Sequence, residues 1–276
     1  MTTPPGAGAR NPATARQTPM MCLAQALGHQ RWIHYGIRFR LARLLLASDI
    51  RTRREFEVAF FGLRYRGNIA SFIDWSVFVF GAYERGLLQF LADAAHALAG
   101  DDAVYVDIGA NVGQHALYMS HHTTTVHAFE PYEPVRRRIE EKIADNRLGN
   151  ILVHPVGLGA ADAGLPFYAP VSFNQGQGTF LPGIVGTGGA PVGELQVARA
   201  DAWFPAHGID RVDLIKIDVE GFEPNVLRGM RAVIERHRPV IVMGSPIKRK
   251  VCNSPRFRPS HAIGRPRTTG ASAKPS

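Results

Sequence analysis

The stretch from residue 104 to residue 115 constrains the fold of this chain more than any other part of its sequence. An apolar run at 104–108 contains Asp107 and is followed by two glycines, Gly109 and Gly113, and then by a helical pattern. This order predicts a strand, a tight loop and a helix N-terminus, whose free N–H groups can face a ligand. Gly109 allows a positive φ or a close ligand approach, and Gly113 allows the helix to pack closely on the strand. The stretch therefore predicts an α/β fold with a ligand site at this loop.

The loop has the spacing D-x-G-x-x-x-G, which differs from the G-x-G-x-x-G of dinucleotide-binding loops. Asp107 stands where a pyrophosphate would lie, and its carboxylate would repel an anionic dinucleotide. The same carboxylate suits a ligand that carries an ammonium and a sulfonium group, such as S-adenosylmethionine. The spacing therefore argues against a NAD-dependent oxidoreductase and favours S-adenosylmethionine as the cofactor.

A second acid follows about one βα unit later. Residues 125–129 read as a strand that ends in Glu130-Pro131. An acid at the tip of the second strand of such a unit is placed to accept hydrogen bonds from both ribose hydroxyls. Taken alone, Asp107 would read as a helix cap and Glu130 as a solvated loop acid. The order of strand, glycine loop, helix, strand and acid favours a cofactor site.

Three segments together resemble the signatures of FkbM-family methyltransferases: 107–113, 128–131 and 216–223. The resemblance extends over about residues 56–243. It implies a Rossmann-like class I methyltransferase fold, with a central, mostly parallel sheet flanked by helices. It also implies S-adenosylmethionine-dependent O-methylation of sugars, polyketides and related small hydroxylated acceptors. The matching positions imply cofactor contacts from Asp107, Gly109, Ala110, Asn111, Gly113, Glu130, Pro131 and Asp218.

The third strand is predicted at 151–156. Many methyltransferases place an acid just beyond this strand for the adenine amino group, but here Gly157 follows. We therefore expect backbone groups around Gly157, or apolar walls, to contact the adenine.

The fourth strand, 212–218, ends in an acid beside the predicted cofactor loop, because ligands of open α/β sheets bind at the carboxyl ends of the strands. An alcohol is a poor nucleophile, and a carboxylate can take its proton as charge develops. Asp218 is the first candidate for this base and Glu220 the second, with Lys216 as an electrostatic partner. We read Glu223 as an acid that complements the N-terminus of the next helix.

The net charge of +9 is unevenly distributed along the chain. Residues 1–54 hold nine Arg or Lys against Asp49 alone, and residues 245–276 hold eight and no acid, which leaves −7 for residues 55–244. The segment with the cofactor signatures is thus acidic, which argues against nucleic acid as the main partner. The two cysteines, Cys22 and Cys252, offer neither a zinc spacing nor a disulfide framework, and suit a reducing, cytoplasmic location. Clustered histidines at 115–127 lack the carboxylate spacing of a metal site, so no metal is expected.

The N-terminal part divides into a tail, 1–20, that we expect to be disordered, and an extension, 21–100, of helices and a hairpin. Residues 21–47 show a helical pattern with arginines beside an apolar stripe: Ile33, Ile37, Leu41, Leu44 and Leu45. Such a helix either lies on an anionic membrane or packs on its own domain, and we favour packing. Two strands are predicted at 55–62 and 63–68. Tyr83 and Glu84 either border the pocket or form the capped start of a helix at 84–98.

Two segments between the second and fourth strands carry weaker signals. The helix at 135–146 has an arginine triplet, 136–138, which we expect to be solvated and paired with glutamates one turn away. The glycine-rich region 160–200 contains Gln175, Gln177 and Thr179 in a long loop, where we expect acceptor specificity.

The C-terminal part departs from the family pattern. A fifth strand is predicted at 238–243, and Gly244 stands where the family normally has an acid. Residues 245–276 show no strand or helix periodicity. They are either a basic tail that binds an anionic partner or the result of a frame change that replaced the closing strands, and we favour the second. The predicted domain is thus 101–244, with its closing strands missing and an open edge that lowers stability and turnover. The alternative function is a methyltransferase-fold protein that binds cofactor without efficient turnover.

Overall fold

The computed structural model of the chain describes residues 17–169, 178–183 and 190–244. Its centre is a five-stranded sheet in the order β10-β9-β3-β4-β5, in which every neighbouring pair is parallel. These strands are β3 (Val104–Ile108), β4 (Thr125–Phe129), β5 (Ile151–His154), β9 (Leu214–Ile217) and β10 (Val240–Met243). The five strands predicted from the sequence are confirmed, although the third ends at His154 rather than at residue 156.

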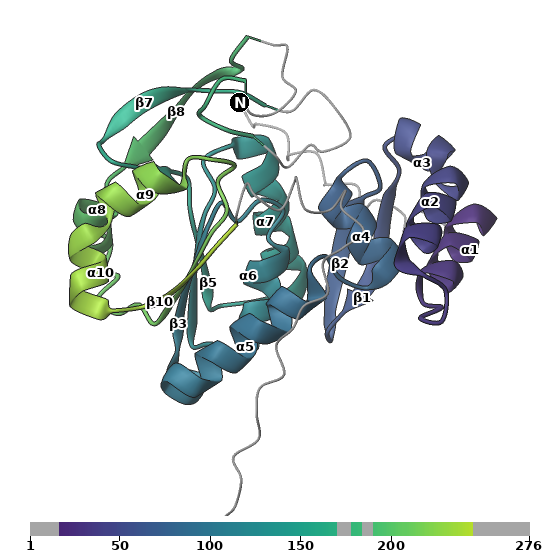
Figure 1. The fold of residues 1–276 in the computed structure, drawn as a ribbon, viewed down its shortest axis with the longest axis horizontal. Coiled ribbons are helices and arrows are strands. Elements are labelled where there is room, and N and C mark those ends of the chain that lie inside the picture. Colours follow the sequence, from purple (N-terminus) through teal and green to yellow (C-terminus); the bar gives the residue numbers. More distant parts are fainter. Residues whose placement is uncertain (1–16, 170–177, 184–189, 245–276) are drawn as a thin grey trace, which may run out of the picture. The chain divides into compact units, whose positions relative to one another are not determined.

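Helices cover both faces of this sheet (Figure 1). One face packs against α5 (Arg85–Ala99), α6 (Gln114–Met119) and α7 (Glu133–Asn146), and the other against α8 (Ala200–Ala206), α9 (Glu223–Gly229) and α10 (Arg231–His237). Side chains of a strand alternate between its two faces. Tyr105 accordingly belongs to the first core cluster, whereas Val106 and Ile108 belong to the second. The expected α/β fold is thus confirmed.

A smaller sheet adjoins the central one. Its order is β6-β8-β7, with β6 (Gly157–Leu158) parallel to β8 (Gly193–Ala198) and β8 antiparallel to β7 (Ala163–Phe167). The glycine-rich region between the third and fourth strands therefore forms a hairpin, β7-β8, on a short continuation of the chain after β5. Gln175 and Gln177 lie outside the described residues.

The part of the N-terminal extension before α5 contains four helices and a hairpin among the described residues. These are α1 (Pro19–Gly28), α2 (Tyr35–Leu45), α3 (Ala47–Arg51), β1 (Glu55–Phe60), β2 (Leu63–Asn68) and α4 (Phe72–Phe80), and the short 3-10 helix η1 (Gly100–Asp102) precedes β3. The two hairpin strands are confirmed, and they pair antiparallel around a turn at Phe61-Gly62. Met21, Trp75 and Leu91 share one hydrophobic cluster with Tyr105 of the central sheet.

The helix expected over residues 21–47 is three helices, and helix starts earlier than predicted, at Pro19. Thr18 caps α1 by accepting a hydrogen bond from the Met21 N–H, and His34 caps α2 in the same way through the Gly36 N–H. The first break follows Gly28, where a Cβ would meet the backbone oxygen of Val79 on α4. α1 thus ends where its backbone comes close to that of α4, a contact between residues that are far apart in the sequence.

The apolar stripe of α2 does not pack as expected. Ile37, Leu41 and Leu44 are 51%, 43% and 74% exposed, whereas Ala42 and the following Leu46 are fully buried. The helix therefore packs mainly through a different face, to which Leu45 of the predicted stripe contributes, whereas Ile37, Leu41 and Leu44 point outward.

The helix expected to begin at Glu223 is also divided, into α9 and α10 at Met230. A Cβ on Gly229 would lie 1.8 Å from the carbonyl oxygen of Gly159, and the Met230 side chain is fully buried. This close approach to the loop after β6 explains the interruption.

β10 forms one edge of the central sheet and pairs only with β9 among the described strands. Val240 and Met243 on it are 37% and 48% exposed. Within the described ranges, no helix has the length and apolar character needed to cross a membrane. Residues 1–16 and 245–276, to which we assigned disordered tails, lie outside the described residues.

Candidate active site

The strand order reverses between β3 and β9, and the loops after these two strands pack directly on each other. Gly109 has φ 79°, and a Cβ there would lie 2.2 Å from the Asp218 carbonyl oxygen. The Asp218 N–H in turn donates to the Ile108 carbonyl. Crevices at such a reversal are where open α/β sheets bind ligands. The positive φ predicted for Gly109 is confirmed, and the close neighbour is the loop of the fourth strand.

Gly113 also has a positive φ, 81°, but its close neighbour differs from the prediction. A Cβ on Gly113 would lie 2.9 Å from Cγ2 of Ile139 on α7, so the glycine allows a helix to approach the loop rather than a strand. Between the two glycines, Asn111 holds a left-handed φ of 54°, and its side-chain oxygen accepts from the Val112 N–H. Asn tolerates this region better than most residues.

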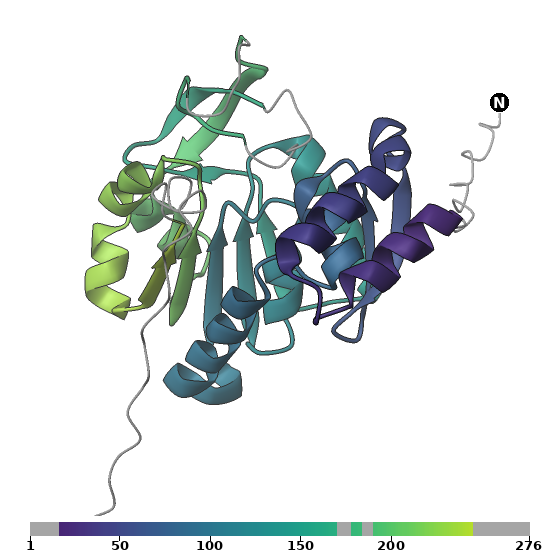
Figure 2. The ribbon, with the colours of Figure 1, turned by 45° about the vertical axis from the view of Figure 1, so that its right-hand side comes forward.

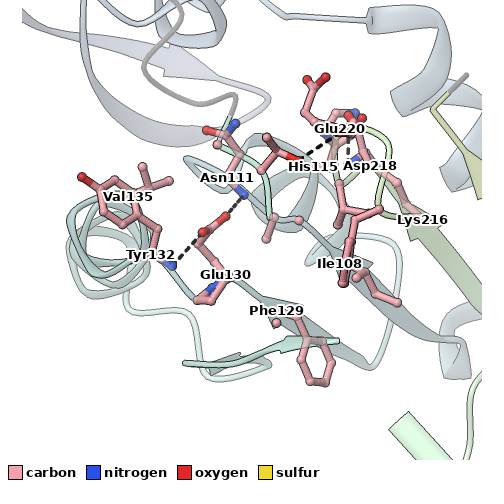
Figure 3. Close-up of a pocket in the computed structure, with 18 of the residues that line it drawn as sticks. Ile108, Asn111, His115, Phe129, Glu130, Tyr132, Val135, Lys216, Asp218 and Glu220 are labelled. Atoms are coloured by element: carbon pink, nitrogen blue, oxygen red, sulfur yellow. Dashed lines mark hydrogen bonds and ion pairs between the residues drawn. The ribbon is translucent and has the colours of Figure 1, made fainter. Parts of the chain in front are cut away.

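A cavity opens at the carboxyl ends of β3, β4 and β9 (Figure 3). Most of the predicted site residues line it: Gly109, Ala110, Asn111, Glu130, Pro131, Gly157, Lys216, Asp218 and Glu220. Asp107 and Gly113 do not line the cavity and lie behind its wall. The Glu130 and Tyr132 side of the cavity is separated from the Lys216, Asp218 and Glu220 side by the loop that carries Asn111.

Glu130 is held by the backbone on both sides of it. Its two carboxylate oxygens accept 3.0 Å hydrogen bonds from the Asn111 and Tyr132 N–H groups. Burial raises the pKa of Glu130 to about 7, although these two hydrogen bonds oppose the shift. Each oxygen keeps a second lone pair for another donor.

Lys216 lies between two acids. Its Nζ is 3.2 Å from Asp107 Oδ1 and 3.7 Å from Asp218 Oδ2. Burial alone would lower the pKa of Lys216, but Asp107 and Asp218 raise it on balance, so the ammonium stays charged. The other oxygen of Asp107, Oδ2, is buried and has no hydrogen-bond partner among the described residues. Lys216 therefore links the buried acid to the one at the cavity.

The wall opposite the sheet comes from the N-terminal extension and the β7 region. Ser71, Phe72 and Ile73 at the start of α4 line it, together with Tyr83 and Thr179. The Thr179 hydroxyl donates to the Glu220 carbonyl, which joins the long loop to the loop after β9. Thr179 was singled out from the sequence; the start of α4 was not, because an apolar run gives no sign that it borders a cavity.

The pocket alternative holds for Tyr83, which lines the cavity, but not for Glu84, which does not. Glu84 precedes the first residue of α5 with a left-handed φ of 47°, and its side chain makes no capping hydrogen bond to that helix. The Tyr83 backbone is clamped by Gln114, which accepts from its N–H and donates to its carbonyl. Burial raises the pKa of Tyr83 above its ordinary value, and nearby carboxylates, first that of Glu84, add to the shift. The phenol therefore stays protonated and can donate a hydrogen bond.

His115 is a further cavity residue that the sequence did not assign. It is 5% exposed, and its Nε2 lies 3.9 Å from the Glu84 carboxylate. Burial lowers the pKa of His115 well below its ordinary value, and Lys216 adds to the effect, so the imidazole is neutral. Among the described residues, no three His, Cys, Asp or Glu side chains group in a way that could hold a metal.

A buried ion network supports the cofactor loop from behind. Lys142 on α7 donates to the Val112 carbonyl at 2.9 Å, and its Nζ lies 3.8 Å from Asp74 on α4. Arg138 reaches the same Asp74 at 3.4 Å, so this member of the arginine triplet is not simply solvated, whereas Arg136 and Arg137 do form the expected helical pairs. The spacing of residues along α7 could not reveal this network, because the acid at its centre, Asp74, belongs to α4 and lies 64 positions before Arg138 in the chain.

The donors and acceptors of the cavity fit S-adenosylmethionine. Glu130 offers carboxylate lone pairs at one side, for hydroxyls. Asp218 and Glu220 at the other side, with the unpartnered Asp107 Oδ2 behind them, favour a cation. The Gly109–Asn111 backbone lines the floor between them.

The parallel sheet, its reversal between β3 and β9 and the acids at the strand ends define a Rossmann-like class I methyltransferase fold. The Methyltransferase FkbM domain family matches residues 107–254, more than half of the chain. The chain belongs to this family.

The chain is also similar to individual proteins and to solved structures. Methyltransferase 1 of Beauveria bassiana is 29% identical in an alignment of 147 residues that covers 47% of this chain and 59% of that protein. The hexuronic acid methyltransferase AglP of Haloferax volcanii is 28% identical over 160 residues, 58% of this chain and 61% of that protein. The chain thus spans about three-fifths of the length of both curated relatives. The crystal structure of methyltransferase FkbM from Methylobacillus flagellatus KT aligns with a TM-score of 0.37 at 17% identity, over 81% of this chain and 47% of that one.

Proposed function

We propose that the chain is an S-adenosylmethionine-dependent methyltransferase that methylates an oxygen of a small hydroxylated or sugar-containing acceptor. One observation carries this proposal. Glu130 follows β4, Asp218 and Glu220 follow β9 of the same sheet, and all three line a single cavity around the Gly109–Asn111 loop. Such an arrangement offers hydrogen-bond acceptors for hydroxyls and negative charge for a cationic ligand in one place.

The cofactor would be held by residues on both sides of this loop. Glu130 would accept hydrogen bonds from the ribose hydroxyls through its free lone pairs, and the backbone at Gly157 would border the adenine. Asp107 would act on the cofactor from behind the cavity wall, through its buried contact with Lys216. When bound, S-adenosylmethionine supplies an electrophilic methyl group.

Asp218 is the residue that we assign to take the proton of the acceptor hydroxyl. Its side chain is 41% exposed on the cavity wall, and the Lys216 ammonium lies 3.7 Å from its Oδ2. A base in this position contributes roughly 10²- to 10⁴-fold in rate. Glu220, two residues further along the same loop, is the second candidate.

The acceptor would bind against the start of α4, Tyr83 and Thr179. This wall combines aromatic and hydroxyl-bearing side chains, which suit the apolar faces and hydroxyls of a sugar ring. The name of the Haloferax volcanii relative, a hexuronic acid methyltransferase, supports a sugar acceptor, and the protonated phenol of Tyr83 could donate to one of its oxygens.

One observation favours the alternative of a protein that binds cofactor without efficient turnover. Gly244 follows β10 where the family normally has an acid, and it lies directly against Asp218: a Cβ on it would be 2.6 Å from Asp218 Oδ1. A missing acid at this position would remove one charged group from the immediate neighbourhood of the proposed base.

Calorimetry and turnover assays with Asp218→Asn separate these functions. Hexuronic acids and neutral hexoses are suitable acceptor probes, with S-adenosylhomocysteine release as the measured product. We expect kcat to fall by about 10²-fold or more while the Kd of S-adenosylmethionine changes by less than about threefold. Asp210→Asn, an exposed acid away from the cavity, is the matched control. If Asp218→Asn keeps wild-type turnover, Glu220 or water must take the proton instead. If the wild type binds S-adenosylmethionine without turnover, the protein is better described as one that binds cofactor without efficient catalysis.

A further inference from the structure

The exposed apolar side chains of the protein are concentrated at α1, α2 and the turn between them. Half of the large hydrophobic residues that are exposed among the described residues fall between positions 20 and 44: Met20, Leu23, Trp32, Tyr35, Ile37, Leu41 and Leu44. Trp32, in the turn, is 82% exposed, and Leu44 is 74% exposed. Scattered exposed apolar residues are ordinary, but a contiguous group on one pair of helices marks an interaction surface.

α2 is apolar on two opposite sides. Ala42 and the adjoining Leu46 are buried, and Phe39 packs edge-on against Trp75 of α4 with ring centroids 5.1 Å apart. Ile37, Leu41 and Leu44 follow the i, i+4, i+7 spacing of a second face, about half a turn around the helix from Ala42 and Leu46. The inner side packs the helix against the protein, so packing within the protein does not explain why the outer side is apolar.

Positive charge surrounds the outer side. Residues 17–54 contain seven arginines and a single acid, Asp49. Asp49 is 5% exposed and pairs with Arg54 at 2.8 Å, so it offers no negative charge to the surface. Arg40 and Arg43 are exposed on α2 itself, and Arg31 is exposed beside Trp32. We name this surface, made of Arg31, Trp32, Ile37, Arg40, Leu41, Arg43 and Leu44, the α2 face.

We infer that the α2 face docks the protein onto an anionic lipid membrane. A helix with exposed Leu, Ile and Trp side chains flanked by arginines lies in the plane of such a surface, with its apolar side among the acyl chains and its arginines at the headgroups. Because no described helix is long enough to span a bilayer, the contact is a surface contact. A second copy of the chain is a poor occupant, since two α2 faces with three exposed arginines each would repel.

The α2 face adjoins the proposed site. A groove beside α2 is lined by His29, Arg31 and Arg38 on one side and by Tyr83 and Arg85 on the other. Tyr83 also lines the active-site cavity. Figures 1 and 2 show α1 and α2 on the side of α4 that faces away from the central sheet.

The inference is tested by cosedimentation of the full chain with phosphatidylcholine vesicles and with vesicles that contain one-fifth phosphatidylglycerol, at about 0.1 M salt, where the Debye length is about 10 Å. We expect binding to the anionic vesicles only, and a blue shift of Trp32 emission that Trp32→Phe removes. Leu41→Ser/Leu44→Ser and Arg40→Glu/Arg43→Glu should each weaken binding by about tenfold or more.

Matched controls separate the α2 face from charge elsewhere. Phe90→Ser removes an apolar side chain that is 52% exposed on α5, and Arg231→Glu/Arg236→Glu reverses two exposed charges on α10. Both should bind vesicles as the wild type does. Binding that survives the α2 variants, for example through the arginines and lysines of residues 245–276, overturns the inference. So does an absence of vesicle binding, or a dimer in light scattering that Leu44→Ser dissolves. The affinity of each variant for S-adenosylmethionine is measured in parallel. It shows that the variant is folded, and it does not depend on whether the variant binds vesicles.

Discussion

The Lys216 ammonium lies 3.2 Å from the Asp107 carboxylate, and these two residues are direct neighbours in the register of β9 and β3. The Asp107 and Lys216 side chains are 0% and 5% exposed, so the pair is buried where the sheet meets the cavity. Asp218, on the loop after β9, faces the same ammonium. One cation thereby connects the acid of the cofactor motif to the acid proposed as the base.

We predict that Asp107→Asn and Lys216→Met will each lower the free energy of unfolding, because each leaves a buried charge without its partner. Breaking a buried pair costs about 3–5 kcal/mol, whereas replacing both members with apolar residues is often close to neutral. The double variant Asp107→Leu/Lys216→Met should therefore be more stable in urea than Lys216→Met. A double variant that is less stable than both single variants would contradict the pairing. Asp107→Asn should also weaken S-adenosylmethionine binding and should not create NAD binding.

Glu130 should make the free energy of unfolding depend on pH, in a direction that follows from its raised pKa. Burial raises its pKa from 4.5 to about 7, so the folded protein keeps a proton that the unfolded chain has lost. Between about pH 4.5 and pH 7 the unfolded state binds fewer protons, and stability falls as the pH rises, by roughly 3 kcal/mol in total. Urea titrations at several pH values should show this slope in the wild type relative to Glu130→Gln. Equal pH profiles for the two proteins would mean that the carboxyl titrates normally.

The same carboxyl should couple cofactor binding to proton release. Ribose hydroxyls that donate to Glu130 favour its charged form and lower its pKa in the complex. S-adenosylmethionine should therefore bind more tightly at pH 7 than at pH 5.5 and release up to about one proton near pH 6. Calorimetry in buffers of different ionisation enthalpy measures this number, and Glu130→Gln provides the control. Glu130→Ala should weaken binding by about 1.5–3 kcal/mol, the range for hydrogen bonds to a charged group.

Lys142 should affect the cofactor site from outside it. It is 1% exposed, donates to the Val112 carbonyl and lies 4.5 Å from the centre of the Tyr65 ring. Lys142→Met removes the tie on the loop, so it should lower stability by about 1–3 kcal/mol and weaken S-adenosylmethionine binding. Arg138→Ala, which removes a half-buried partner of Asp74 and touches no loop atom, should lower stability without the loss of affinity. Equal losses of affinity in the two variants would show that Lys142 acts only through general stability.

The parts of the fold that could be predicted are those with a local signal. The strands β3, β4 and β9 read as apolar runs, and Gly109, Glu130 and Asp218 follow from their places at strand ends. What could not be predicted depends on distant contacts. Helices end at Gly28 and Gly229 because another backbone comes close there, and the Gln114 clamp on Tyr83 joins residues 31 positions apart. The apolar residues on the outward side of α2 have a helical spacing like that of the residues on its inward side, so periodicity alone could not predict which side packs against the protein.

The edge strand β10 supplies the last prediction. Val240 and Met243 are exposed on a strand that pairs with β9 alone among the described strands, and an exposed apolar edge is a template for pairing with other chains. We therefore expect the full chain to aggregate on heating, and Val240→Lys to raise the temperature at which light scattering begins, because a charge on an edge opposes strand addition. Leu98→Lys, the same type of change at a 45% exposed position on α5, is the control and should have little effect. Thermal melts with and without S-adenosylmethionine distinguish edge pairing from weak folding. If Val240→Lys and Leu98→Lys scatter light at the same temperature as the wild type, β10 is not the surface through which the chains associate.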